Sequence, residues 1–180
     1  MKYAITGGIG SGKSYVCHLL EQRGISVYDC DAGAKRLMRT SSDLQRRLSE
    51  AVGHDIFPNG VLDKPALATF LLASEENNLI VNSIVHPAVA EDFQQSGMTW
   101  MESAILFEAD FLKYVDRVVC VSAPLEVRIE RVMQRDGISR EKALEWINRQ
   151  MPQEEKERRS DYVIINDGLQ SLEQQIDKII

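Results

Sequence analysis

The sequence is poor in cysteine and contains no long apolar run. Its three cysteines, Cys17, Cys30 and Cys120, form no C-x-x-C pair. An odd number of widely spaced cysteines is typical of reduced thiols in packing positions, and it argues against a disulfide framework. No stretch approaches the roughly 20 apolar residues of a membrane span, and the N-terminus lacks a signal-peptide pattern. We therefore expect a cytoplasmic protein with no membrane partner.

An excess of positive charge is also missing. The 180 residues carry a formal net charge of −6, and the pI is about 5.2, so broad binding to nucleic acid is not expected. A small anionic ligand is compatible with this charge, because Arg and Lys can cluster locally in an acidic protein. The chain is 44% hydrophobic and 27% charged, which suits one α/β domain with a smaller inserted part. We expect a monomer or a weak homo-oligomer.

What the sequence does contain is a glycine-rich stretch near its start, Thr6-Gly7-Gly8-Ile9-Gly10-Ser11-Gly12-Lys13-Ser14. It fits the phosphate-binding loop pattern of Gly, any four residues, Gly, Lys and Ser or Thr. Residues 1–6 are predicted to form a short buried strand, and a helical pattern runs from Lys13 to Gly24. An ordinary glycine-rich turn is the alternative. Strand, loop and helix in this order favour a nucleotide triphosphate site.

Each residue type in this loop has a chemical reason. Glycines permit backbone angles that a side chain forbids, and they let N–H groups approach a polyphosphate. Those amides form a concave nest for an anion, and the following helix adds the positive end of its dipole. Lys13 can bring a positive charge to the β and γ phosphates, and the Ser14 hydroxyl is suited to bind Mg²⁺.

Two carboxylates follow the second predicted strand, residues 25–29, in the run Asp29-Cys30-Asp31. Ligands gather at the carboxyl ends of parallel strands, so we expect these acids near the glycine loop. Asp31 is the candidate that orients an acceptor hydroxyl and takes its proton during phosphoryl transfer. A helix N-cap is the alternative role for Asp31, and the two roles are compatible. The basic residues of the helix that follows are Lys35, Arg36 and Arg39.

Residues 41–97 have little strand character. We predict a helical insertion between the second and third strands, where a second substrate could bind. One of its helices is expected from Glu75 to Val85, with Pro87 either interrupting it or starting a new helix. His86 is equally compatible with a substrate contact and with a structural cap.

Strand character returns at residues 99–102, where Glu102 at the strand end could reach Mg²⁺ through water. Residues 117–122 and 162–166 are predicted as two further strands, the first of them clearly buried and parallel. Five strands with helices between them predict an α/β fold built on a doubly wound parallel sheet. A last helix is expected to carry Leu169, Leu172, Ile176 and Ile179.

The region from residue 128 to residue 159 is dense in arginine. Its members are Arg128, Arg131, Arg135, Arg140, Arg149, Arg158 and Arg159. A kinase must neutralise phosphate charge and exclude water, and an arginine-rich helical flap would do both. For any single arginine, a solvated position on a helix surface is the alternative. Because the group follows a phosphate loop in the chain, we predict a functional flap.

Taken together, these residues closely resemble the dephospho-CoA kinase family over nearly the whole chain. Residues 6–14 match that family's glycine loop residue for residue. The glycine loop alone is shared by many nucleotide enzymes, whereas the ordered set of motifs is much more specific. The further matching motifs are Asp29-x-Asp31, Gly60-x-Leu62-Asp63, His86-Pro87-x-Val89, Leu106-Phe107-Glu108, Arg135-Asp136, Gln150-Met151-Pro152, Lys156 and Asp161-x-Val163-Ile164-x-Asn166-x-Gly168.

The resemblance implies a three-layer P-loop NTPase fold with a five-stranded parallel sheet, a helical substrate-binding insertion and a helical lid. The core is expected at 1–31, 98–130 and 158–180, the acceptor-binding region at about 32–97, and the lid at about 131–157. The implied reaction moves the γ-phosphate of ATP to the 3′-hydroxyl of dephospho-CoA, with Mg²⁺. This is the last step of coenzyme A synthesis.

The resemblance also implies roles for individual residues. The catalytic pair is Asp31 and Lys13. ATP is expected to bind at Gly8, Ile9, Gly10, Ser11, Gly12, Lys13, Ser14, Tyr15, Arg135, Arg140, Arg149, Asn166 and Gly168. The acceptor is expected at Asp31, Lys35, Arg36, His86, Leu106, Phe107 and Glu108. The metal ligands are Ser14 and, through water, Glu102.

Several positions depart from the usual family pattern. Tyr15 stands where a small Thr is common, and Lys35 replaces an Arg whose fork a lysine cannot reproduce. Glu102 replaces a usual Asp and is one methylene longer. Trp146 replaces a usual lid Arg, and Arg149, about one turn later on the same helix face, could stand in for it.

Two other functions fit the phosphate loop. One is a kinase for another small molecule on the same fold, and the other is a nucleotide-operated switch that binds a protein. The sequence lacks the Asn-Lys-x-Asp motif that reads guanine in GTPase switches, which counts against the second.

Overall fold

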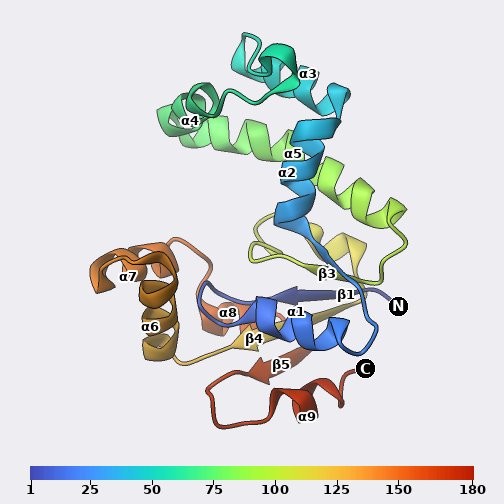
Figure 1. Cartoon of the computed structure of the whole chain (residues 1–180), viewed down its shortest axis with the longest axis vertical. Helices are drawn as coiled ribbons and strands as arrows, with labels where there is room; N and C mark the ends of the chain where they lie inside the picture. Colours follow the sequence, from blue (N-terminus) through green and yellow to red (C-terminus); the bar gives the residue numbers. More distant parts are fainter. The chain divides into compact units, whose positions relative to one another are not determined.

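The computed structural model describes residues 1–180. It contains a five-stranded sheet in the order β2-β3-β1-β4-β5 (Figure 1). The strands are β1 (Tyr3–Thr6), β2 (Val27–Asp29), β3 (Trp100–Glu102), β4 (Arg117–Ser122) and β5 (Tyr162–Ile165). β1 pairs in parallel with β3 and β4, and β4 pairs in parallel with β5. The predicted α/β fold with a five-stranded parallel sheet is confirmed.

The strand order decides where a ligand can bind. β1 is the central strand, and the chain adds strands on both of its sides. In open α/β sheets the carboxyl end of such a strand is the place where ligands bind. The glycine loop follows directly after β1, so the fold puts it at that position.

The chain divides into two compact units. The core unit comprises Met1–Tyr28 and Met98–Ile180, and the helical unit comprises Asp29–Gly97. The segment predicted as a lid, about 131–157, therefore groups with the core unit. Asp31, which was expected in the core, belongs to the helical unit, because α2 begins at Cys30 and packs against α5.

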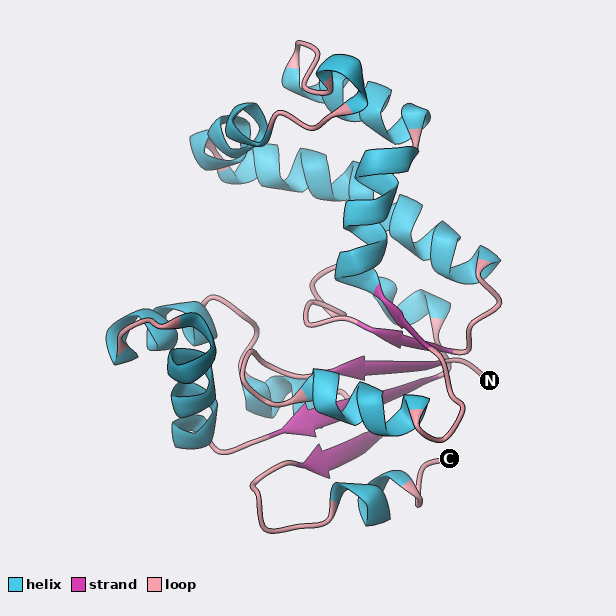
Figure 2. Ribbon diagram, viewed as in Figure 1, coloured by secondary structure: helices cyan, strands magenta, loops and turns pink.

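Helices cover both faces of the sheet in the core unit (Figure 2). Ile5, Val119 and Ile164 point to one face, where Leu19 and Leu172 from two helices bury them. Side chains alternate along a strand, so their neighbours point to the opposite face, where α8 contacts β4. The helices of this unit are α1 (Lys13–Glu21), α6 (Leu125–Asp136), α7 (Arg140–Asn148), α8 (Gln153–Arg158), α9 (Leu172–Ile176) and the 3₁₀ helix η2 (Phe111–Tyr114).

The helical unit is built around one long helix, α5, against which the other three pack. The helices are α2 (Cys30–Thr40), α3 (Ser42–Val52), α4 (Lys64–Ala73) and α5 (Glu75–Gln95), with a 3₁₀ turn η1 (Pro58–Gly60) before α4. The expectation that Pro87 ends or restarts this helix is wrong, because α5 runs through it. A proline removes one helical hydrogen bond. Val85, Val89 and Phe93 nevertheless form a buried stripe four residues apart, and this packing holds the helix together across Pro87.

The last helix is shorter than predicted. Leu169 is 90% exposed and lies before α9, and Ile179 lies after it. The Asp167 carboxylate accepts hydrogen bonds from the backbone amides of Leu169 and Gln170. This turn uses the amides that a helix would need, so the helix begins only after the next cap.

The three cysteines are free thiols, and Cys30 and Cys120 are buried. Burial raises the pKa of the Cys120 thiol to about 11, so the group is neutral and unreactive at pH 7. The predicted packing role fits these positions. None of the helices combines the length and the apolar character needed to cross a bilayer.

Two neighbours in β5 test the assignment of the core. Ile164 is 1% exposed and belongs to the core under α1, whereas Val163 on the other face is 38% exposed. We expect Ile164→Ala to lower the free energy of unfolding by about 2–5 kcal/mol, because it leaves a cavity. Val163→Ala should cost less than about 1 kcal/mol. Urea unfolding of both variants measures this, and equal losses would contradict the assignment of the faces.

Candidate active site

The glycine loop after β1 has its carbonyl groups held from one side. Nε of Arg128 donates to the carbonyl of Ile9 at 3.0 Å. Nδ2 of Asn166 donates to the carbonyl of Ser11 at 2.8 Å, and Nη1 of Arg131 lies 3.3 Å from the same oxygen. The guanidinium of Arg131 also donates to Asn166, which ties the two side chains together.

These hydrogen bonds to the carbonyl groups orient the amides of the loop. The N–H of a trans peptide points opposite to its C=O, because the unit is planar. With the carbonyls of Ile9 and Ser11 held by cations and an amide, the N–H groups of Gly10 and Gly12 point the other way. Neither amide has a hydrogen-bond partner within the protein. Two backbone donors are thus left for an anion at the start of α1, where the helix dipole also favours negative charge.

The amides of Gly8 and Ile9 are used differently. The N–H of Gly8 donates to Oε1 of Gln153 at 2.9 Å, and the N–H of Ile9 donates to Oε1 of Gln150 at 2.8 Å. Gln153 is buried, and its Nε2 donates to the carbonyl of Val121 in β4. A glutamine oxygen is a neutral acceptor, so it fixes the loop without placing a negative charge beside it.

Glycine is required where these groups approach the loop. A Cβ built on Gly12 would lie 2.1 Å from Nδ2 of Asn166, and one on Gly8 would lie 2.2 Å from Nη2 of Arg128. Gly12 also has a φ of +93°, in the left-handed region that side chains disfavour. Arg128 is 5% exposed, and burial lowers its pKa, although an arginine stays charged in proteins.

A cation and an acid lie together beside the loop. Nζ of Lys13 is 3.8 Å from Oε1 of Glu102, and both side chains are largely buried. Glu102 ends β3 next to β1, as its pairing with Ile5 shows. The predicted position of Glu102 beside the phosphate loop therefore agrees with the sheet register.

Three buried hydroxyls in the same region have no hydrogen-bond partner within the protein. They belong to Thr6, Ser11 and Ser103. Thr6 ends β1, and Ser103 follows the last residue of β3, so both lie at the carboxyl edge of the sheet. Buried polar groups are normally satisfied, so unpaired ones call for a polar ligand or water. The surroundings of the loop thus fit a hydrated anion and its counter-ion.

The known relatives of this chain agree with this geometry. The model of the dephospho-CoA kinase family matches residues 1–171. The chain belongs to the dephospho-CoA kinase family. A dephospho-CoA kinase of Bacteroides fragilis is 45% identical over 187 aligned positions, which cover 100% of this chain and 91% of the relative. One from Porphyromonas gingivalis is 38% identical, covering 98% of this chain and 91% of that protein.

Solved structures support the same fold. A protein from Thermus thermophilus has a TM-score of 0.83 at 34% identity, covering 99% of this chain and 95% of that chain. A dephospho-CoA kinase from Campylobacter jejuni has a TM-score of 0.65 at 22% identity, covering 99% and 96%. A shikimate kinase from Acinetobacter baumannii, solved with shikimate, has a TM-score of 0.52 at 17% identity, covering 99% and 89%. The last two show the α/β kinase fold alone.

In the helical unit, Asp29 and Asp31 have different positions. Asp29 is the N-cap of α2, and its carboxylate accepts from the N–H of Ala32 at 2.9 Å. The cap role that sequence left open for Asp31 therefore falls to Asp29. Asp31 lies in the first turn of α2 and is exposed, and its carboxylate has no partner within the protein. It remains available to a substrate hydroxyl.

The other predicted acceptor residues of this unit differ in their surroundings. Arg36 forms an ion pair with Asp92 of α5, whereas Lys35 forms none. His86 is half-buried within α5, and burial lowers its pKa, so the ring is neutral at pH 7. A neutral imidazole can donate or accept a hydrogen bond but brings no charge.

The predicted acceptor loop at 106–108 is mostly interior. Leu106 is completely buried and has no exposed surface with which to contact an acceptor. Phe107 is also buried, with the guanidinium of Arg159 4.4 Å from its ring centre. Oε1 of Glu108 accepts from the N–H of Met151 and lies 3.4 Å from Nζ of the buried Lys156. Of the three residues, only Glu108 presents a polar group.

The three lid arginines that were expected to bind ATP lie on the surface. Arg135 pairs with Asp136, Arg140 pairs with Glu126, and Arg149 pairs with Glu145. None of them contacts the glycine loop. Arg128 and Arg131 hold it instead, since α6 starts directly after β4 and its first turns lie next to the loop. Arg135 is one turn further along the helix.

The sequence did not predict that four residues bind the loop, namely Arg128, Arg131, Gln150 and Gln153. Arg128 and Arg131 were predicted only as members of the arginine-rich flap. Arg128 and Arg131 are three apart at the start of a helix that follows a strand, so their shared face was readable from the sequence. Gln150 belongs to a family motif, but nothing in that motif indicates that its side chain bonds a loop amide. Asn166, which was predicted to bind ATP, donates a hydrogen bond to the carbonyl of Ser11 in the loop.

Two glycines with the same φ of +93° test the site. Gly12 has Asn166 within 2.1 Å of a built Cβ, whereas Gly53 at the end of α3 has nothing within 4 Å. We expect alanine at either position to cost about 1–2 kcal/mol of stability from backbone strain. Only Gly12→Ala should also displace Asn166 and weaken ATP binding by more than about 10-fold. Calorimetric titration with ATP measures this, and wild-type affinity in Gly12→Ala would contradict the geometry.

Proposed function

We propose that this protein transfers the γ-phosphate of ATP to the 3′-hydroxyl of dephospho-CoA. The observation that carries the proposal is the pair of open amides at Gly10 and Gly12, beside Lys13 and Glu102, in a chain that belongs to the dephospho-CoA kinase family. Phosphoryl transfer depends mainly on positioning and charge neutralisation. In this site, the two backbone amides can position the phosphates and Lys13 can neutralise their charge.

The donor side of the mechanism uses the core unit. The amides of Gly10 and Gly12 bind phosphate oxygens, and Lys13 neutralises charge on the β and γ phosphates as it leaves Glu102. Arg128 and Arg131 act behind the loop, because their hydrogen bonds to its carbonyls keep the amides aimed at the phosphates. Preorganised donors of this kind need no rearrangement when charge develops in the transition state.

The acceptor side uses Asp31. Its carboxylate is exposed and free of internal partners, so it can accept a hydrogen bond from the 3′-hydroxyl. The hydrogen bond orients the oxygen for attack on the γ-phosphorus, and the carboxylate takes the proton late in the transfer.

Mg²⁺ is the metal that fits the residues present. When bound, the ion would neutralise negative charge on the phosphates of ATP. No group of three His, Cys, Asp or Glu side chains forms a protein-only metal site. Mg²⁺ usually keeps waters and binds one or two carboxylates together with substrate phosphates. The Ser14 hydroxyl and, through water, Glu102 would hold it here.

We also propose that the enzyme works in the cytoplasm without nucleic-acid or membrane partners, as a monomer or a weak homo-oligomer. The three free thiols support a reducing compartment. The net charge of −6 argues against a polyanionic partner.

The direct test mixes the protein with MgATP and dephospho-CoA and detects coenzyme A by mass. We expect Asp31→Asn to lower kcat by about 10²–10⁴-fold, because the hydroxyl loses its proton acceptor. The affinity for ATP should not change. Asp29→Asn is the matched control: asparagine also caps helices, so stability should hold and kcat should fall by less than about 10-fold. Equal kcat values for the two variants would remove Asp31 from this role.

A second test addresses the metal. We expect Glu102→Gln to raise the Mg²⁺ concentration needed for half-maximal rate by about 5-fold or more, since the site loses a carboxylate. Asp110→Asn removes an exposed acid of the same unit, 76% accessible and paired with Lys113, at a positive φ that asparagine tolerates. Its Mg²⁺ requirement should match that of the wild type. Chelation by EDTA should stop the reaction, and added Mg²⁺ should restore it.

A further inference from the structure

The helical unit contains a pocket of about 400 Å³ that the donor site does not include. It is lined by Lys35, Met38, Arg39, Gly60, Val61, Leu62 and Lys64. Three of these residues are cations, and none is an acid. The nearest acid in the sequence, Asp63, bonds the N–H of Ala66 as the cap of α4.

The cations of this pocket differ from the other cations of the unit in that they form no ion pair. The unit has six Lys and Arg residues. Arg36 pairs with Asp92, and Arg46 and Arg47 pair with Asp43. The remaining three are Lys35, Arg39 and Lys64, and they form no ion pair. All three cations without a carboxylate partner therefore line the same pocket.

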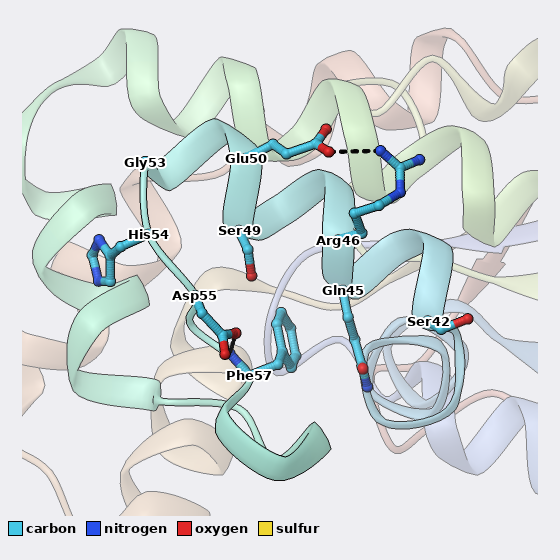
Figure 3. Close-up of a pocket in the computed structure, with 9 residues that line it drawn as sticks. All are labelled: Ser42, Gln45, Arg46, Ser49, Glu50, Gly53, His54, Asp55 and Phe57. Carbon is cyan, nitrogen blue, oxygen red and sulfur yellow. Dashed lines mark hydrogen bonds and ion pairs between the residues drawn. The ribbon is translucent and has the colours of Figure 1, made fainter.

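A second pocket of this unit has a different charge balance. It holds about 560 Å³ beside α3 and is shown in Figure 3. There Arg46 is bound by Glu50, and the carboxylate of Asp55 accepts from the N–H of Phe57. Its single arginine is already neutralised, so this pocket has no unpaired arginine to attract an anion.

We propose that the pocket of Lys35, Arg39 and Lys64 binds the diphosphate of the acceptor. The proposal rests on the proposed function and assigns one part of its substrate to one site. Dephospho-CoA is an ester of a nucleoside 5′-diphosphate, whose two negative charges suit a pocket of three cations. Charge-assisted hydrogen bonds to phosphate oxygens are among the stronger polar contacts in proteins.

The spacing along α2 fits this assignment. A helix rises about 1.5 Å per residue, so Lys35 and Arg39 lie about 6 and 12 Å further along the axis than Asp31. Residues four apart share a helix side, which puts Asp31 and the two cations in one row. In the acceptor, the 5′-diphosphate begins only a few bonds from the 3′-hydroxyl. A hydroxyl bound at Asp31 would therefore bring the diphosphate to Lys35 and Arg39.

The remaining lining suits the rest of the acceptor. Met38, Val61 and Leu62 are apolar, and Val61 is 68% exposed. The turn before Val61 and Leu62 has a defined backbone conformation, with Asn59 at φ 56° and Gly60 at φ 77°. An exposed valine beside unpaired cations suits a ligand in which an anionic group continues into an alkyl chain, as the diphosphate continues into the pantetheine arm of dephospho-CoA.

The test removes two charges from the pocket and compares them with two removed elsewhere. Arg39→Gln combined with Lys64→Gln should weaken binding of dephospho-CoA by about 10-fold or more, measured by calorimetric titration without ATP. KM for dephospho-CoA should rise by a similar factor, with KM for ATP unchanged. Arg46→Gln combined with Arg47→Gln changes the net charge of the same unit equally, so it should leave both quantities within about 2-fold of wild type.

A second ligand separates the diphosphate from the rest of the substrate. Adenosine lacks the diphosphate, so its affinity should be the same in wild type and in the pocket variant. Equal affinity of the two proteins for dephospho-CoA would overturn the proposal, as would an equal loss in the Arg46 and Arg47 control. If the wild type makes no coenzyme A, the proposed function fails, and the titration still decides whether the pocket binds the diphosphate.

Discussion

The site depends on the hydrogen bonds that hold the carbonyl side of the glycine loop. Arg128, Arg131 and Asn166 reach this backbone from α6 and from the end of β5. A peptide unit has its donor and acceptor on opposite sides, so binding the acceptors decides where the donors point. Without these contacts, nothing in the sequence of the loop alone would direct the amides of Gly10 and Gly12 to the same side. The fold makes these contacts by bringing α6 and the residue that follows β5 to the glycine loop.

The distribution of charge follows the same logic. A net charge of −6 does not exclude a small anionic ligand, because cations that lack an acidic partner can cluster locally. On the surface of α6 and α7, Arg135, Arg140 and Arg149 are neutralised by neighbouring carboxylates. Arg128 and Arg131 instead meet neutral carbonyls, and so their charge still acts on the loop. In the helical unit, ion pairs again leave a subset of cations available, and that subset lines one pocket.

The residues proposed to bind the two substrates belong to different units. The groups suited to a phosphate donor belong to the core unit, and the exposed Asp31 belongs to the helical unit. Asp29 joins the two, since it ends β2 and caps α2. The cap at Asp29 therefore sets where α2 starts. The helix then spaces Asp31, Lys35 and Arg39, the residues proposed for the acceptor, at regular intervals.

The sequence by itself determined the glycine loop, the five strands, the parallel sheet and the family, because these depend on local pattern. Glycine positions, apolar runs and the order of motifs can all be read along one chain. Only the tertiary structure decided which arginines hold the loop, that Gln150 and Gln153 bind the amides of Ile9 and Gly8, and that Leu106 is buried. It also decided that α5 continues through Pro87, since packing of the buried stripe outweighs one lost hydrogen bond. Partners distant in sequence depend on which elements meet in space, and no local pattern contains that information.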